Sequence, residues 1–377
     1  MPATTVRPAS VDEVAAALRD TRGPVLPHGT GTKLDWGAPA ARVDVELDLT
    51  GLDTVVEHNP GDLVVRAQAG ARLADLQAHL ETHRQRLALD PPLGGTLGGI
   101  TATNAAGPLR HRFGSPRDLL IGVTAVRADG VVARAGGKVV KNVAGYDLMK
   151  LFCGSWGTLG VVVETAWRLH PLPAAVRAVL VAGADPVAVV RGLVRSRLAP
   201  SAVELSGSPG QWTVTVLFEG GERAVTEQAA SAGGDRVLDH RPEGLGAWPD
   251  APVVLKVAHA PSGLRALLGA LPPGARVTHA PAVGVGLVGL PAEGPADGPA
   301  DGPADRRADG TAATVGALRA ALAPHDGSVV VLRTPAWVKR AVDVWGDVGD
   351  ALPLMRRVKR QFDPDGVFAA GRFVGGI

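Results

Sequence analysis

Apolar residues recur with strand-like or helical spacing through the first half of the chain. Ser10 and Glu13 form a capping-box pattern before the apolar run VAAALRD, which predicts a helix that stops at Gly23–Pro24. Asp129–Gly130 is a typical hairpin turn and predicts a hairpin over residues 120–136. Other apolar or alternating runs predict strands at residues 24–27, 43–49, 62–70 and 154–169 and helices at 71–83 and 147–152.

From Ala174 the pattern changes to strand, helix, strand, strand and helix, which is typical of an α+β unit with an antiparallel sheet. Three tandem GPAD copies lie within Glu293–Gly310, and their Pro, Gly and Asp content predicts a disordered surface insertion. We therefore divide the chain into a first domain, a second domain that contains the insertion, and a C-terminal segment: residues 1–173, 174–340 with insertion 293–310, and 341–377.

Composition narrows the possible classes of protein. The 377 residues are 46% hydrophobic and 20% charged, as in ordinary globular proteins. A formal net charge of +2 and 4% aromatic residues do not favour nucleic-acid binding. Cys153, the single cysteine, excludes an internal disulfide and is predicted to be a small buried hydrophobic residue. No leader or long apolar run is recognisable, so we expect a cytoplasmic protein with at most peripheral membrane association through partners.

Two glycine-rich stretches suggest a cradle for an anionic ligand. Residues 28–37, HGTGTKLDWG, form a tight glycine turn, which could also be a plain loop between strands. The turn lacks the Walker A spacing, and Leu34 stands where a Rossmann turn needs its third glycine. Residues 89–171 contain further glycines among Thr, Ser and Asn, without an obvious nucleophile or carboxylate pair. Glycine lets backbone N–H groups converge on a phosphate, so this segment is interpreted as a cofactor cradle.

The ordered series LGGTLGGITATNAAG, RFGSPRD and KNVAGYDLMKLFCGSWGTLGV resembles the FAD-binding domain of the vanillyl-alcohol oxidase / p-cresol methylhydroxylase superfamily, including the FAD-binding subunits of bacterial glycolate oxidase complexes. The resemblance implies an α+β fold: a two-subdomain FAD-binding domain of the p-cresol methylhydroxylase type with a smaller α+β cap domain. The tail FDPDGVFAAGR resembles a terminal superfamily segment that returns to the flavin, with Ala369–Ala370 in place of Asn-Pro.

The resemblance also implies which residues hold the cofactor. Thr32 and Lys33 occupy the loop end where some relatives attach FAD through His, so non-covalent FAD is expected. Trp156 stands where many relatives carry an acidic residue. A helix opened by Gly98 is expected to direct its N-terminus at the pyrophosphate. The expected cofactor-binding residues are His28, Gly29, Thr30, Gly31, Thr32, Lys33, Pro92, Thr96, Gly98, Gly99, Thr103, Gly107, Gly114, Gly157, Gly160 and Val162.

The sequence identifies no catalytic residue and no metal site. His79 and His83 stand four residues apart on the predicted helix but lack a recognisable third ligand, so they are interpreted as a solvated face. The only tyrosine, Tyr146, is interpreted as a packing residue. The later histidines are interpreted as loop or surface residues: His240, His259, His279 and His325. Without a visible carboxylate clamp or base, the isolated chain is expected to be nearly inert towards a hydroxy acid.

The function implied by the resemblance is that of an FAD-dependent oxidoreductase acting on CH–OH donors. We expect the FAD-binding subunit of a glycolate (2-hydroxy acid) oxidase complex, which oxidises glycolate to glyoxylate beside a related flavoprotein subunit and an iron–sulfur subunit. One alternative is a free-standing oxidoreductase on another small alcohol or acid, with Arg110, His111 or Arg112 as anion handle. Another is a non-catalytic flavin-binding assembly subunit.

Overall fold

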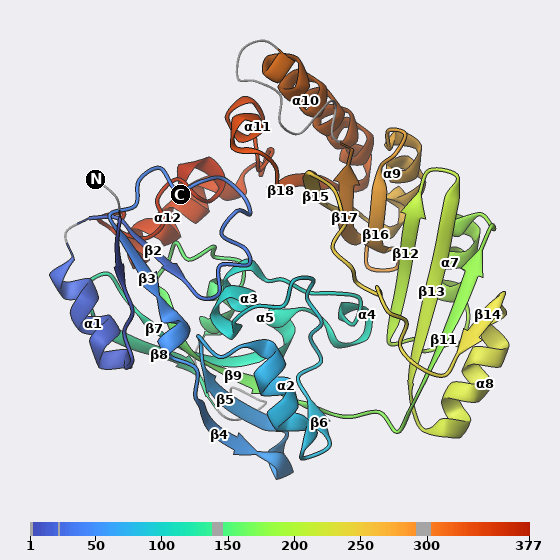
Figure 1. Cartoon of the computed structure of the whole chain (residues 1–377), viewed down its shortest axis with the longest axis horizontal. Coiled ribbons are helices and arrows are strands. Elements are labelled where there is room, and N and C mark those ends of the chain that lie inside the picture. Colours follow the sequence, from blue (N-terminus) through green and yellow to red (C-terminus); the bar gives the residue numbers. More distant parts are fainter. Residues whose placement is uncertain (1–2, 22, 138–145, 292–302) are drawn as a thin grey trace.

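The computed structural model describes the chain except residues 1–2, 22, 138–145 and 292–302. Figure 1 shows an N-terminal part, blue to green, beside a second part built around one large sheet. This mixture of sheets and helices confirms the predicted α+β class. No helix in the described ranges is long and apolar enough to cross a membrane.

The N-terminal part contains two main sheets. The smaller is parallel, in the order β1 (Thr4–Val6), β3 (Val45–Asp48), β2 (Val25–His28). The larger is antiparallel, in the order β4 (Val55–Asn59), β5 (Val64–Gln68), β9 (Val161–Arg168), β7 (Leu120–Val126), β8 (Val132–Gly136). A short antiparallel pair joins β6 (Gln85–Arg86) to β10 (His170–Pro171).

Helix α1 (Val11–Asp20) begins where the capping box predicts. Ser10 Oγ accepts a hydrogen bond from the Glu13 N–H at 3.2 Å, and Glu13 Oε2 accepts one from the Ala9 N–H at 2.9 Å. Its buried side packs against residues of both sheets. The other helices of this part are short: α2 (Leu73–Glu81), α3 (Leu97–Thr103), α4 (Arg110–Phe113), α5 (Pro116–Leu119) and α6 (Met149–Phe152).

The second part is an eight-stranded antiparallel sheet. Its order is β14 (Arg236–Leu238), β11 (Ala175–Ala182), β13 (Gln211–Gly220), β12 (Ala202–Ser208), β16 (Arg276–Ala280), β17 (Val285–Leu290), β15 (Val253–Ala258), β18 (Ser328–Arg333). One face is covered by α7 (Pro186–Arg195), α8 (Glu222–Ala232), α9 (Leu264–Ala270) and α10 (Pro303–Leu322).

Alternation along the strands places polar residues on the opposite face of this sheet. Leu205 of β12 packs on the helix side, whereas its neighbour Ala202 packs against Leu109, next to α4. Because successive side chains point to opposite faces, Glu204 lies on the same face as Ala202. Lys256 of β15 is likewise opposite to Leu255, which belongs to the helix-side core. The strands thus present charged groups to the N-terminal part.

Helix α10 corrects the prediction of disorder for residues 303–310, the last part of the predicted insertion 293–310. The helix begins at Pro303, within the last GPAD copy, while residues 293–302 lie outside the described residues. Proline is well tolerated in the first turn of a helix, and the Ala- and Leu-rich sequence beyond it has strong helix propensity. Val315, Leu318 and Leu322 are buried in the core, which anchors the helix.

The chain after β18 passes through α11 (Ala336–Ala341) and α12 (Ala351–Phe362) and then returns to β2. The Val25 N–H donates to Val367 O at 2.7 Å, and the Ala369 N–H donates to Val25 O at 2.9 Å. Phe368 between them is fully buried. These bonds place the following residues, including Arg372, beside the loop after β2.

The sequence predicted that Tyr146 packs against other residues and that Cys153 is buried. Tyr146 is 88% exposed, so its interpretation as a packing residue is wrong. Cys153 is partly buried against the core of the N-terminal part, close to expectation, and burial raises the pKa of its thiol to about 12. It is therefore an unreactive thiol at neutral pH.

Candidate functional site

The loop after β2 carries a row of unbonded backbone donors. Within the described residues, no hydrogen bond is made by the N–H groups of residues 29–33, whereas the Leu34 N–H donates to Gly31 O at 3.1 Å. Gly31 has φ +74°, a conformation that glycine adopts without strain. A loop with several free N–H groups is suited to bind an anion.

Helix α3 packs against this loop at very short range. A Cβ added to Gly29 would lie 2.2 Å from Thr96 Oγ1, so only glycine permits this approach. Thr96 is the N-cap of α3, and its hydroxyl accepts the Gly99 N–H at 3.4 Å. The Gly98 N–H donates to Ala69 O at 2.8 Å. The first-turn donors are therefore already bonded, so the expected contribution of this helix N-terminus to pyrophosphate binding would rest on its dipole and stays a prediction.

Two buried cations, Lys33 and Arg372, lie behind the loop. Each is only 6% exposed, and neither forms an ion pair with any described residue. Lys33 Nζ donates to Gly94 O and, at 3.1 Å, to Thr32 Oγ1, while Arg372 Nη2 donates to Lys33 O at 2.8 Å. Burial lowers the pKa of Lys33 to about 8 and that of Arg372 to about 10. A buried cation without a counter-charge is costly, and an anionic ligand would supply that charge.

Three cavities with shared walls run from β9 to the large sheet. The first is bounded by Leu49, Gly160 and Val162, and it shares His28 and Gly99 with the second. The second cavity is lined by the loop after β2 and by Arg372, and it shares Thr103 and Trp156 with the third. The third cavity, with an empty volume of about 680 Å³ including open solvent, lies between the N-terminal part and the large sheet. Together the cavities suit an elongated ligand.

Trp156 lies where the second and third cavities meet. Its backbone has φ +57°, which is unusual for a bulky residue, and its N–H donates to Ala102 O at 2.9 Å. Its indole packs edge-on against Trp345 with centroids 4.8 Å apart. An aromatic side chain packed against a second indole therefore stands at the junction of the two cavities.

The third cavity is lined by two cations that sequence reasoning did not bring together. Arg110 comes from α4 and Lys256 from β15. Neither side chain has an ion pair within the described part of the chain. Burial lowers the pKa of Lys256 to about 8, with a smaller contribution from the positive charge of Arg110. The two cations are therefore close enough to repel each other, and a small carboxylate between them would relieve that repulsion.

Glu204 of β12 lines the same cavity without neutralising these cations. Its carboxyl accepts the Gly246 N–H at 2.8 Å, and burial raises its pKa to about 8. At neutral pH it is mostly protonated, and as pH rises it becomes a strong buried base. Its position could not be read from the sequence, because pairing of distant strands decides which residues share a cavity.

Of the residues predicted to bind the anion of the substrate, Arg110 lines the third cavity, while Arg112 donates to Glu219 O at 3.4 Å.

Two of the later histidines are buried, which corrects their interpretation as loop or surface residues. His279 of β16 is 1% exposed and lines the third cavity, and His259 is 6% exposed. Their rings stack at 4.9 Å with an interplanar angle of 6°. Both ring nitrogens of His279 lack a partner within the described chain, and burial lowers its pKa to about 3, so the ring is neutral.

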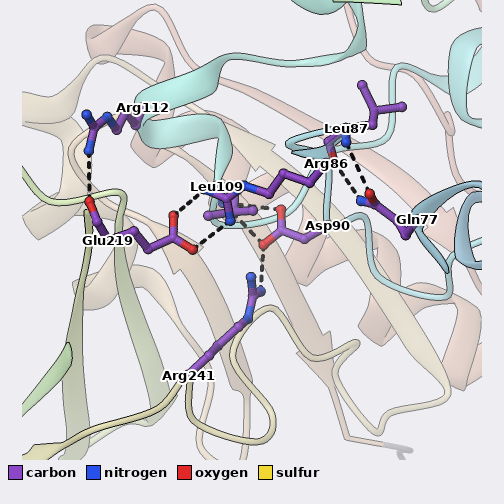
Figure 2. A network of polar contacts seen from close by, with 8 residues as sticks. All are labelled: Gln77, Arg86, Leu87, Asp90, Leu109, Arg112, Glu219 and Arg241. Atoms are coloured by element: carbon purple, nitrogen blue, oxygen red, sulfur yellow. Dashed lines mark hydrogen bonds and ion pairs between the residues drawn. The ribbon is translucent and has the colours of Figure 1, made fainter. Parts of the chain in front are cut away.

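A network of polar contacts joins the N-terminal part to the large sheet (Figure 2). Arg86 of β6 makes a bidentate ion pair with Glu219 of β13, with N···O distances of 2.7 and 2.8 Å. Arg241, which follows β14, pairs with Asp90 at 2.6 Å, and Asp90 also accepts the Leu109 N–H. These contacts hold the large sheet against the cavity walls of the N-terminal part.

Most of the expected cofactor-binding residues line the three cavities, and their roles stay predictions. Gly107 lines the third cavity, where a Cβ would lie 1.9 Å from Asp90 O. Gly114, in contrast, lines none of the three: it ends α4 with φ +83°, and a Cβ there would meet Asp118. The residues that do line a cavity are His28, Gly29, Thr30, Gly31, Thr32, Lys33, Pro92, Thr96, Gly98, Gly99, Thr103, Gly107, Gly157, Gly160 and Val162.

The histidine pair on α2 also differs from expectation. His58, at the end of β4, brings to His79 and His83 a third imidazole that the sequence did not reveal, although His79 and His83 are exposed as expected. Strand β4 pairs with β5, and this places His58 beside the helix that follows β5. This three-histidine cluster lines none of the three cavities.

Comparison with known proteins agrees with this geometry. Residues 2–136 match the family described as FAD binding domain. The chain is 37% identical over 170 residues to glycolate oxidase subunit GlcE of Escherichia coli (strain K12), covering 44% of this chain and 48% of that protein. It is 31% identical over 217 residues to glycolate oxidase subunit GlcD of Bacillus subtilis (strain 168), covering 55% and 46%. It is 32% identical over 212 residues to D-lactate dehydrogenase of Anaerostipes hadrus, covering 54% and 44%.

These alignments span about half the length of each relative. Among solved structures, an alkyldihydroxyacetonephosphate synthase matches with a TM-score of 0.66 at 14% identity, covering 97% of this chain and 75% of that one. At this identity the likeness concerns the fold alone. The family match confirms the predicted FAD-binding domain with FAD as its cofactor, and the structural likeness confirms the α+β fold.

Proposed function

We propose that the chain is the FAD-carrying subunit of an assembly that oxidises a small 2-hydroxy acid, with glycolate as the substrate and glyoxylate as the product. The observation that carries the proposal is the chain of three joined cavities with unpaired buried cations at two points along it. Similarity to glycolate oxidase subunits and to a D-lactate dehydrogenase supports the same class of substrate.

The residues of the second cavity fit the pyrophosphate of FAD. Lys33 and Arg372 are buried without a carboxylate partner in the described chain, and the N–H groups of residues 29–33 are unbonded. Gly160 and Val162 would contact the adenosine end in the first cavity. Bound FAD accepts a hydride and passes electrons on singly or in pairs.

The residues of the third cavity fit a 2-hydroxy acid. Arg110 and Lys256 supply two positive charges for its carboxylate. Glu204, with its raised pKa, can accept the hydroxyl proton when it is ionised. Trp36 and Trp156 add apolar walls to the same cavity. With these roles the chain would hold both a carboxylate clamp and a base, so its expected inertness towards a hydroxy acid becomes a question for experiment.

Two experiments test the proposal. The purified, FAD-loaded chain is mixed anaerobically with glycolate, and bleaching of the flavin absorbance is followed. We expect bleaching by wild type and a loss of at least about tenfold in its rate for Lys256→Met, because one charge-assisted contact contributes roughly 1.5–3 kcal/mol. Equal rates in both proteins would contradict the assigned carboxylate site.

Acid denaturation should release FAD into the supernatant, whereas flavin in the precipitate would exclude non-covalent binding.

The role as a subunit is tested separately by steady-state turnover. The chain is assayed with a dye acceptor alone and after addition of the proposed partners, a related flavoprotein subunit and an iron–sulfur subunit. We expect turnover to rise several-fold with the partners, since they would take electrons from the reduced flavin. Full turnover by the single chain would instead establish the free-standing oxidoreductase.

A further inference from the structure

The cluster of His58, His79 and His83 lies at the surface of the N-terminal part, where β4 meets α2. One ring nitrogen from each residue lies within 4.8 Å of the others. The ring centroids are 4.8 Å apart for His58 and His83, 5.2 Å for His58 and His79, and 5.8 Å for His79 and His83. Three imidazoles thus converge without a carboxylate in the group.

The hydrogen bonds of Gln85 determine which nitrogen of His58 carries the proton. Gln85 Nε2 donates to Pro60 O at 2.7 Å, which fixes the orientation of the side-chain amide. Gln85 Oε1 must then accept the hydrogen bond from His58 Nε2 at 3.0 Å. His58 Nδ1 is therefore a bare lone pair, and it is buried with no partner in the described chain. This arrangement is typical of a metal-binding histidine.

Thr82 fixes the proton of His83 in the same manner. Its hydroxyl donates to His79 O at 2.7 Å, so its oxygen accepts from His83 Nδ1 at 2.9 Å. The lone pair of His83 is then on Nε2. His79 stands one helical turn before His83 on the same side of α2 and its C-terminal extension. Neutral imidazoles are the form that binds metal ions.

We propose that these three imidazoles form a transition-metal site that binds Zn²⁺, with the fourth position open to water. Neutral imidazole ligands suit Zn²⁺, whereas Ca²⁺ and Mg²⁺ prefer oxygen ligands. Tetrahedral coordination needs nitrogen atoms about 3.3 Å apart, which follows from zinc–nitrogen bonds of about 2.0–2.1 Å. His79 and His83 are exposed, so their rings can close around the ion by small rotations. Metal would tie β4 to α2, outside the three cavities.

The test is calorimetric titration of the full chain with Zn²⁺ alone, together with the visible spectrum after Co²⁺ addition. We expect one equivalent of Zn²⁺, a tetrahedral-type Co²⁺ spectrum and a higher melting temperature with metal. His58→Gln removes the buried ligand and should weaken binding by about 100-fold or more, since even loss of an outer hydrogen-bond partner costs about 10–100-fold. His240→Gln is the matched control, because this exposed histidine lies outside the cluster, and it should bind as wild type does.

A second variant separates ligand loss from misfolding. Gln85→Met keeps the length of the side chain but removes the acceptor that fixes the His58 tautomer, so affinity should fall by about tenfold. Melting temperature and flavin content without metal are measured for every variant. Absence of Zn²⁺ binding by wild type, or equal affinity in wild type and His58→Gln, overturns the proposal. The latter result would mean that the pair on α2 alone binds the ion.

Discussion

The second and third cavities are each lined by a lysine whose charge is unpaired among the described residues. Lys33 and Lys256 both have a pKa lowered to about 8 by burial, and neither has an ion pair in the described chain. The loop sequence was enough to include Lys33 among the expected cofactor-binding residues. The sequence could not place Lys256 and Glu204 in one cavity, because they lie on strands far apart in the sequence and only the sheet register brings them together.

Replacing Gly98 or its neighbour Gly99 by valine should impair the protein in two different ways. A Cβ on Gly98 would lie 3.0 Å from Ala69 Cβ and 3.1 Å from Ala69 O, inside the protein. A Cβ on Gly99 would approach only Thr96 Oγ1, at 3.3 Å, and Gly99 lines both the first and second cavities. Gly98→Val should therefore lower the melting temperature, whereas Gly99→Val should lose FAD at nearly unchanged melting temperature. Wild-type flavin content in Gly99→Val would show that its side of α3 does not contact FAD.

The pH dependence of the flavin half-reaction follows from two groups in the third cavity. Glu204, with a pKa raised to about 8, gains its base form as pH rises towards 8. Lys256, with a pKa lowered to about 8, loses its positive charge above 8. The rate with limiting glycolate should consequently give a narrow bell with its maximum near pH 8. Glu204→Gln should be slowed by roughly 10²–10⁴-fold and should lose the rising limb; a rising limb that persists would exclude Glu204 as the base.

At the scale of elements, the sequence correctly predicted those helix starts and turns that depend on a few neighbouring residues. The capping box at Ser10 and the turn at Asp129–Gly130 are correct because capping and turn preferences act within a few residues. Helix α10 was missed, because the GPAD copies have loop composition while the start of the helix depends on tertiary contacts further along it. His58 was missed because strand pairing, not sequence spacing, brings it to α2.

The packing of α10 gives a test of its contribution to stability. Leu318 is fully buried in the helix-side core of the large sheet. Leu318→Ala should lower the free energy of unfolding by about 2–5 kcal/mol, since it removes apolar contacts and leaves a cavity. Ala317→Ser on the exposed side of the same helix is the control and should change it by less than about 0.5 kcal/mol. Denaturant titration measures both, and equal effects would mean that α10 is not packed on the sheet.

At the scale of the whole molecule, the ion pair between Arg86 and Glu219 joins the N-terminal part to the large sheet (Figure 2). Both side chains are mostly buried, so Glu219→Leu leaves the Arg86 charge without its partner. We expect a loss of about 3–5 kcal/mol in the free energy of unfolding. The double variant Arg86→Met with Glu219→Leu should recover part of this loss. Additive losses in thermal denaturation would show that the two residues do not interact in solution.

The return of the chain to β2 has a consequence for biosynthesis. Arg372 reaches the carbonyl of Lys33 across 339 positions of sequence, and Val367 and Ala369 bond to Val25. A ribosome that has translated β2 and its loop has made only one side of the anion-binding surface. The second buried cation, the guanidinium of Arg372, arrives after the large sheet has been synthesised. Stable acquisition of FAD should accordingly be a late event, so that ribosome-stalled chains ending before Arg372 retain little flavin even when their sheets have formed.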